Sequence, residues 1–232
     1  MKKIMKYNFR MLLTSFAYFY FPAILLIAIT TFTLYSFVGS EPNEVPELIS
    51  NRMFIIMALF MYTIGAILIL SNLVIPEKTT GRIELLLSNG FEIQPYLYSS
   101  IIVGWIVMEV ELVLIFIIPN ILTITFLEKS FFNGSLFKII IFVSAFGFGL
   151  LSIMYYLIFR IRRISIINNL FFIIGFIVVF GGSYLTSTFP LTEQFNDIIL
   201  WILLGAGVFL FFFTVVAGRK ITKETVVLTI PD

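Results

Sequence analysis

The stretch MFIIMALFMYTIGAILILSNLVIPEKTTGRIELLLSNG, residues 53–90, decides the fold because it joins an uncharged run to a charged, leucine-rich one. Residues 53–75 contain no Asp, Glu, Lys or Arg, whereas residues 76–90 contain two acidic and two basic residues. A helix needs about 20 apolar residues to cross about 30 Å of hydrocarbon. The first run is therefore long enough to span a membrane, and the second is too polar to lie inside one.

Apolar runs of this length recur along the chain. Its 232 residues are 60% hydrophobic and 12% charged, and the mean hydropathy is +1.07. A soluble domain is typically near half apolar, with about a quarter of its residues charged. The runs do not alternate polar and apolar residues, as the strands of a membrane barrel would. We predict an all-α membrane protein, a single transmembrane domain over 1–232, with six transmembrane helices near 16–38, 53–75, 98–118, 136–159, 164–184 and 198–217. The third run continues past Pro119 to Leu127, which leaves open a kinked or an extended helix.

The basic residues predict the orientation of these helices, because cytoplasmic loops of membrane proteins are enriched in Lys and Arg. One set of loops holds twelve of the fifteen basic residues: Lys2, Lys3, Lys6, Arg10, Lys78, Arg82, Arg160, Arg162, Arg163, Arg219, Lys220 and Lys223. The opposite set holds three: Arg52, Lys129 and Lys138. We therefore predict a multi-pass protein of the cell membrane with both termini in the cytoplasm. No concentrated basic patch indicates nucleic acid.

Several chemistries are excluded by missing residue types. The chain has no Cys and no His, which excludes disulfides and His-based acid–base catalysis and makes a usual zinc site untenable. It also lacks the phosphate-binding pattern G-x-x-x-x-G-K-[ST]. We assign it no catalytic residue, metal or cofactor of its own.

Residues 76–90 predict a short amphipathic helix on the cytoplasmic side. Pro76 suits the end of the second span, Thr80 can cap a new helix, and Asn89–Gly90 can stop it. At helical spacing Ile83, Leu86 and Leu87 share one face, Glu84 and Ser88 share another, and Leu85 is left on the flank. Amphipathicity alone leaves two readings open: an interfacial helix that closes a loop, or a docking element for a partner.

The same segment resembles one in the permeases of ABC-2 type transporters. Residues in common with that family's pattern are Glu77, Lys78, Gly81, Ile83, Glu84, Leu86, Leu87 and Ser88. The chain departs at Arg82, where Thr is common, and at Asn89, where Pro is common. The position, between the second and third of six spans, also agrees with the family.

This resemblance implies a fold, a partner and a function. In the family this segment, here near 77–89, is a coupling helix seated on a separate ATPase subunit. The implied assembly is a homodimer of permeases with two ATPase subunits, which bind ATP and Mg and drive export of an amphipathic or lipophilic solute, including cationic or toxin-like peptides. Glu77, Lys78, Arg82 and Glu84 are the expected polar contacts with the ATPase. Lys2–Thr14 would form an amphipathic elbow, with Lys2, Lys3, Lys6 and Arg10 on anionic lipid.

Two carboxylates, Glu109 and Glu111, lie near the middle of the third span. Residues two apart on a helix point about 200° away from each other, so we expect separate environments and no shared metal site. One would line a translocation pathway and the other would bond to a neighbouring span, with Thr63, Ser71, Asn72, Asn168 and Asn169 as candidate partners. Interhelical bonding without any contact to cargo remains the alternative for both.

Small residues predict close contacts between helices. Ala145 and Gly149 form a small-xxx-small pair, and Gly181–Gly182 and the pair Gly205 and Gly207 permit a close approach or a bend.

Other classes of membrane protein remain as alternatives. An ATP-independent channel or secondary transporter would be active when the chain is reconstituted alone. A scaffold protein would carry no transport at all, and an intramembrane enzyme is disfavoured by the missing His and Cys and by the separated carboxylates.

Overall fold

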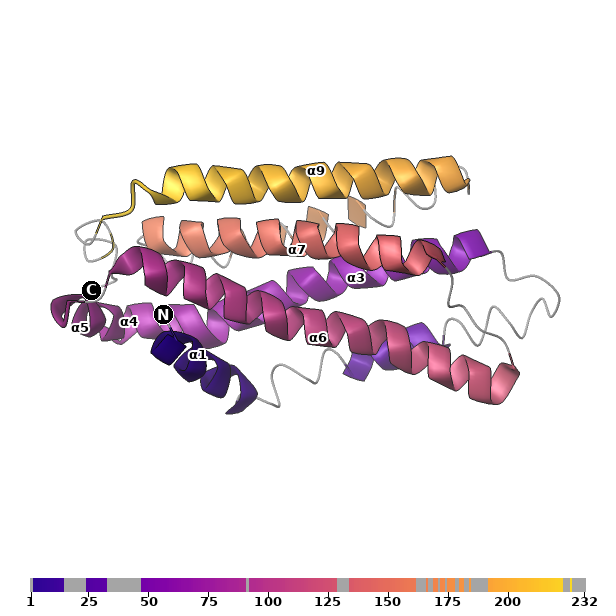
Figure 1. Cartoon of the computed structure of the whole chain (residues 1–232), viewed down its shortest axis with the longest axis horizontal. Helices are drawn as coiled ribbons and strands as arrows, with labels where there is room; N and C mark the ends of the chain where they lie inside the picture. Colours follow the sequence, from indigo (N-terminus) through magenta and orange to yellow (C-terminus); the bar gives the residue numbers. More distant parts are fainter. Residues whose placement is uncertain are drawn as a thin grey trace.

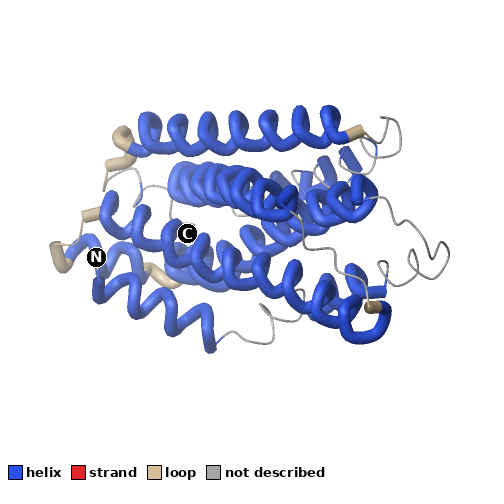
Figure 2. Tube along the Cα trace, turned by 45° about the vertical axis from the view of Figure 1, so that its right-hand side comes forward, coloured by secondary structure: helices blue, strands red, loops and turns tan. Residues whose placement is uncertain are grey.

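The computed structural model describes residues 2–14, 24–32, 47–90, 92–128, 134–161, 192–222 and 226, with scattered positions between 166 and 184. Within this part of the chain the regular structure is helical and contains no strand, so the all-α prediction is confirmed (Figure 2). The long helices run side by side as a bundle, as Figure 1 shows.

Four stretches of the described residues are long and apolar enough to cross a membrane: Ser50–Thr79, Ile93–Phe126, Gly134–Arg160 and Glu193–Gly218. They correspond to the second, third, fourth and sixth predicted spans. The first and fifth, 16–38 and 164–184, lie largely outside the described residues, which include a helical piece at 24–32 and single helical positions from 166 to 184. The prediction of six spans therefore stays a prediction.

The second predicted span is longer than the sequence suggested. Helix α3 (Glu47–Ile69) continues through one π-helical turn, η1 (Leu70–Val74), into α4 (Ile75–Thr79). The prediction that the span ends at Pro76 is wrong, because this proline falls in the first turn of α4, where its missing N–H costs little. The wider turn brings the Ile75 N–H to the carbonyl of Leu70, five residues back.

The predicted coupling helix is divided into two pieces. Residues 77–79 belong to α4, and a turn at Thr80 and Gly81 leads into the separate helix α5 (Arg82–Ser88). Thr80 does not cap α5: its hydroxyl donates to the carbonyl of Pro76 at 2.7 Å, and Gly81 takes the N-cap position with φ of 70°. The stop is confirmed, since Asn89 donates its backbone N–H and its amide to Leu85 and Gly90 has φ of 82°.

The third span is a single helix, α6 (Ile93–Leu127), that continues past Pro119, so its extension to Leu127 is confirmed. Pro119 lies inside it and has no N–H to donate to the carbonyl of Ile115, while the Asn120 amide donates to the next carbonyl, Phe116 O, at 2.9 Å. At 1.5 Å per residue, 35 residues measure about 52 Å. This exceeds the roughly 30 Å of hydrocarbon, so part of α6 must lie beyond it or the helix must tilt.

Helix α9 (Glu193–Gly218) packs against α7 (Gly134–Arg160) along its length, as Figure 1 shows. Their backbones touch at small residues. A Cβ on Gly149 would overlap the carbonyl of Gly207, and one on Gly207 would overlap the backbone of Ala145. The predicted close approach is thus found at Ala145, Gly149 and Gly207, whereas Gly205 and Gly181 have open space around them.

Helix α1 (Lys2–Thr14) occupies the residues predicted for the elbow and packs against α6. Ile4, Asn8 and Leu12 on one face are buried, while Lys6 and Arg10 on the other are exposed. The amphipathic helix is therefore present, and its contact with lipid remains a prediction.

The α7–α9 contact can be tested with paired glycine variants. We expect Gly207→Leu to lower the free energy of unfolding by about 1–3 kcal/mol, because its side chain would push α9 off the backbone of α7. Thermal unfolding of the purified protein in detergent measures the effect. The control is Gly205→Leu, two residues away in open space, which should unfold like the parent. Equal losses in both variants would contradict the contact.

Candidate functional site

The candidate site is the segment α4–α5 with the helices that hold it. Figure 1 shows α1, α4 and α5 at one end of the bundle, beside the start of α6 and the ends of α7 and α9; we name this the α5 end. The segment lies beyond the long apolar run of α3, and all four of its charges fall within eight residues, 77–84.

Two of these charges, Glu77 and Lys78, are buried, with 2% and 1% of their surface exposed. The Lys78 ammonium donates to the carbonyls of Ile158 at 2.5 Å and Ile161 at 2.6 Å. Ile158 lies in the last turn of α7, whose carbonyls have no donor within the helix, and Ile161 directly follows that turn. The Glu77 carboxylate accepts a hydrogen bond from the hydroxyl of Tyr96 on α6.

This burial is physically reasonable because each of the two side chains has a hydrogen-bond partner inside the protein. The last turn of a helix carries partial negative charge, and a cation there contributes typically 0.3–1 kcal/mol, up to about 2 kcal/mol when it is partly buried. A buried lysine without acceptors would cost several kcal/mol. Lys78 therefore joins α4 to α7, and Glu77 joins α4 to α6.

Further hydrogen bonds converge on the first turns of α6. Asn8 of α1 donates to the Ser100 hydroxyl at 2.8 Å, and the Tyr155 hydroxyl of α7 donates to the Ser100 carbonyl at 3.3 Å. The amide of Gln94 donates to the carbonyl of Gly218 at the end of α9, at 2.5 Å. Helices α1, α4, α7 and α9 are thus all tied to α6 at this end.

The outer face of α5 has the opposite character. Arg82, Glu84 and Leu85 are exposed, Leu85 by 63%, whereas Ile83 and Leu87 are buried. Leu86 is half-buried, so the faces predicted from helical spacing are confirmed. The helix therefore presents two charges and one large apolar side chain outward.

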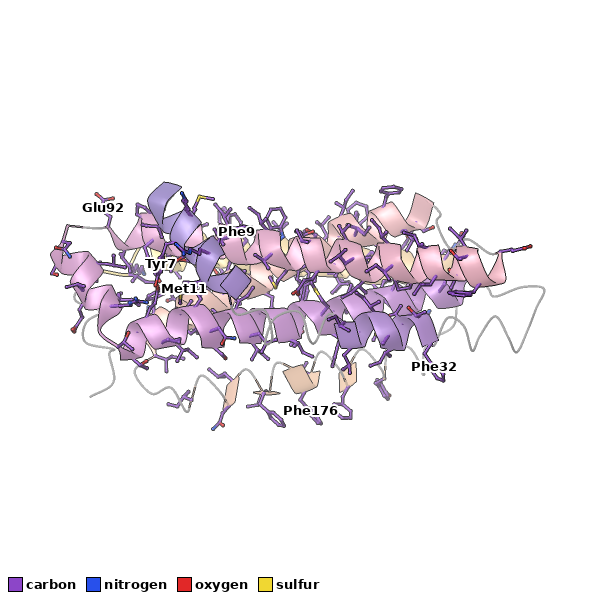
Figure 3. All side chains as sticks on the ribbon, turned by 90° about the horizontal axis from the view of Figure 1, so that it is seen from below. Tyr7, Phe9, Met11, Phe32, Glu92 and Phe176 are labelled. Atoms are coloured by element: carbon purple, nitrogen blue, oxygen red, sulfur yellow. The ribbon has the colours of Figure 1, made fainter. Side chains whose placement is uncertain are left out.

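Arg82 also connects α5 to α1. Its guanidinium donates to the hydroxyl of Tyr7 at 2.5 Å; Figure 3 labels Tyr7 on α1. Beneath this contact lies a mainly apolar cavity of about 300 Å³ between α1, α5 and α6, lined by Ile4, Tyr7, Glu77, Arg82, Leu85, Leu86 and Tyr96. A shallow apolar recess thus adjoins the exposed face of α5.

The four predicted ATPase contacts therefore lie in two environments. Arg82 and Glu84 are exposed, although Arg82 also donates to Tyr7, whereas Glu77 and Lys78 are buried. The sequence contained a signal for this difference. Counting from Leu70, Leu73 and Val74 are at i+3 and i+4, and Glu77 and Lys78 at i+7 and i+8, so a helix that continued past Pro76 would bury all five on one stripe.

The described basic residues separate in space as they do in sequence. The α5 end carries Lys6, Arg10, Lys78, Arg82, Arg160, Arg219 and Lys220. At the opposite end Arg52 donates to Asn196 at 3.1 Å, and Lys138 pairs with Asp197 at 2.6 Å, both at the start of α9. The side chains of Lys2 and Lys3 lie outside the described residues.

A second polar cluster surrounds Glu109 in the middle of the bundle. The hydroxyls of Tyr62 on α3 and Ser144 on α7 both donate to its Oε1, the latter at 2.7 Å. Gly147 makes room for this arrangement, because a Cβ there would overlap the Tyr62 ring. Of the partners that the sequence suggested, Thr63 and Asn72 donate instead to carbonyls of their own helix.

Glu111 has a different environment, as predicted. It is 3% exposed, its Oε1 has no hydrogen-bond partner among the described residues, and its Oε2 faces Gly65 of α3. Glu109 therefore cross-links three helices, while Glu111 is a buried carboxyl with unused capacity. No group of three or more acidic side chains comes together in the described part of the chain to hold a metal ion.

In comparisons with known proteins, no family model, no curated protein and no solved structure matches the chain.

The roles of Glu109 and Glu111 can be distinguished by how replacing each one changes the stability of the protein. We expect Glu109→Leu to lower the free energy of unfolding by about 1–3 kcal/mol, because it leaves the buried Tyr62 hydroxyl and the Ser144 hydroxyl unpaired. Glu111→Leu is the matched control and should be neutral or stabilising, because it removes a buried carboxyl that lacks a full set of partners. Thermal unfolding in detergent measures both. A larger loss for Glu111→Leu would refute the assignment.

Proposed function

We propose that the chain is the membrane-spanning subunit of an ATP-driven ABC-2 type exporter. Two copies would assemble with two copies of a separate ATPase that binds ATP and Mg. The complex would reside in the cell membrane and move an amphipathic or lipophilic solute outward, with cationic or toxin-like peptides as the favoured cargo class.

The observation that carries this proposal is the two-sided character of α5. A helix that only closed a loop could show the same two faces, so the proposal also draws on the resemblance of residues 77–88 to the coupling segment of ABC-2 type permeases. Here Arg82, Glu84 and Leu85 stand outward while the segment behind them is tied to α6 and α7. Since the chain has no phosphate-binding loop, a partner at this face is where ATP hydrolysis would act.

The distribution of basic residues supports the orientation. Seven described Lys and Arg side chains lie at the α5 end and two at the other. An excess of positive charge marks the cytoplasmic side of a membrane protein. In this orientation α5 and both termini would face the compartment that supplies ATP, and Lys6 and Arg10 would lie at the height of anionic headgroups.

The buried acid residues support a role in selecting cargo. Ionisable groups in a membrane span are costly and usually face protein or a solute path. Glu109 already accepts two hydrogen bonds, so Glu111, with an unpartnered oxygen, is the better candidate for contact with a cationic group.

The same carboxyl favours a second candidate, a secondary transporter that runs without ATP. A buried, unpartnered carboxyl in mid-span is the kind of group that carries protons in such proteins. The chain reconstituted alone into vesicles would then move cargo when a proton gradient is applied, with no ATPase added.

Binding of an ATPase through α5 can be tested with two equal charge changes. The probe is a co-expressed ATPase that carries a phosphate-binding loop and is encoded beside this chain. Glu84→Lys should weaken its binding at least about tenfold, equivalent to about 1.4 kcal/mol, because Glu84 is exposed at the start of α5. Co-purification and stimulated ATP hydrolysis measure the effect.

The control is Glu193→Lys, which makes the same change in the first turn of α9 at the opposite end. It should bind like the parent. If the parent captures no such ATPase, or if both variants bind equally well, the proposed docking face is wrong.

A further inference from the structure

Lys78 reaches across the fold to a helix that begins more than fifty residues later. Its ammonium lies 2.5 Å and 2.6 Å from the carbonyls of Ile158 and Ile161, and its side chain is almost wholly buried. Only Thr79, Thr80 and Gly81 separate Lys78 from the first residue of α5. The exposed docking face is therefore a few residues from an anchor on α7.

We propose that Lys78, assisted by Glu77, is a positioning residue that fixes α5 to the ends of α7 and α6, so that a displacement of α5 is passed to the spanning helices. The proposal rests on the function given above only for the origin of that displacement. Lys78 acts through α7 and touches neither cargo nor nucleotide in this role.

The chemistry of the contact suits a rigid link. An ammonium has three donors and no acceptor, and the last carbonyls of a helix are acceptors without backbone donors. Two short hydrogen bonds from one nitrogen fix the α4 end relative to the last turn of α7. Burial removes water as a competitor for either partner.

A second attachment prevents α4 from rotating about the first. Glu77 accepts from Tyr96 of α6, and the Tyr96 ring stands edge-on to Phe159 of α7, with centroids 6.1 Å apart. The segment is thus attached to two helices at one place. Because α7 carries α9 through its glycine contact, α5, α7 and α9 form one mechanical unit.

The opposite end offers a comparison. There Lys138 pairs with Asp197 at 2.6 Å, but both side chains are at least one-third exposed. Exposed ion pairs contribute little because water and salt screen them. Lys78 at the α5 end thus provides a buried link, whereas Lys138 at the opposite end provides an exposed one.

The absence of Cys from the sequence permits a direct measurement. Spin labels at Ser88→Cys on α5 and Arg160→Cys on α7, both exposed positions, report the distance between the two elements by pulsed electron paramagnetic resonance. The protein with native Lys78 should give one narrow distribution. Lys78→Met, which keeps an unbranched stem and loses the terminal ammonium with its donors, should at least double its width.

Lys138→Met is the matched control, because it also removes one ammonium, and it should leave the distribution unchanged. A Lys78→Met distribution that overlays that of native Lys78 would overturn the proposal. If Lys78→Met does not yield a monodisperse protein, Lys78→Leu takes its place. This side chain has no donor for either carbonyl, so the distribution should again broaden, and an unbroadened one overturns the proposal equally.

A second readout separates positioning from general stability. With the ATPase bound, Lys78→Met should retain most of the ATP hydrolysis rate while cargo moved per ATP falls at least fivefold. An unchanged ratio would overturn the coupling role. If the parent binds no ATPase, the proposed function fails, and the distance measurement still decides whether Lys78 fixes α5 to α7.

Discussion

Hydrocarbon cannot hydrogen-bond to a peptide, and four of the described helices are long and apolar enough to be subject to this constraint. Every polar group in the apolar stretches must find a partner inside the protein. The long helices satisfy their own backbones, and side chains such as Thr63 and Asn120 return their donors to carbonyls of the same helix. Glu111 keeps one carboxyl oxygen without a partner among the described residues. Several other polar groups gather at two places, around Glu109 and at the first turns of α6.

These two places differ in what they connect. The Glu109 cluster binds α3, α6 and α7 at mid-depth and depends on the space left by Gly147. The cluster at the α5 end joins the ends of helices, where carbonyls without a backbone donor accept hydrogen bonds from a lysine. The first arrangement holds spanning helices in register, and the second holds an external segment onto them.

Much of the fold could be predicted because it depends on local composition. Four predicted spans coincide with long helices, the faces of α5 follow its spacing, and α1 occupies the expected residues. The errors occur where backbone geometry decided the outcome. The second span continues past Pro76, and a π-helical turn precedes this proline. Gly81 rather than Thr80 takes the N-cap position of α5, because the turn requires a positive φ there.

The sequence by itself determined which segments are apolar enough to leave water, where the basic residues gather along the chain and that the phosphate-binding pattern G-x-x-x-x-G-K-[ST] is missing from it. Transfer free energy and motif spacing are read from neighbouring residues, so they need no fold. The helical spacing from Leu70 already indicates that Glu77 and Lys78 turn inward, but only the tertiary structure decided which groups they meet. The acceptors of Lys78 lie 80 and 83 residues away, and nothing local to residues 76–90 specifies that meeting.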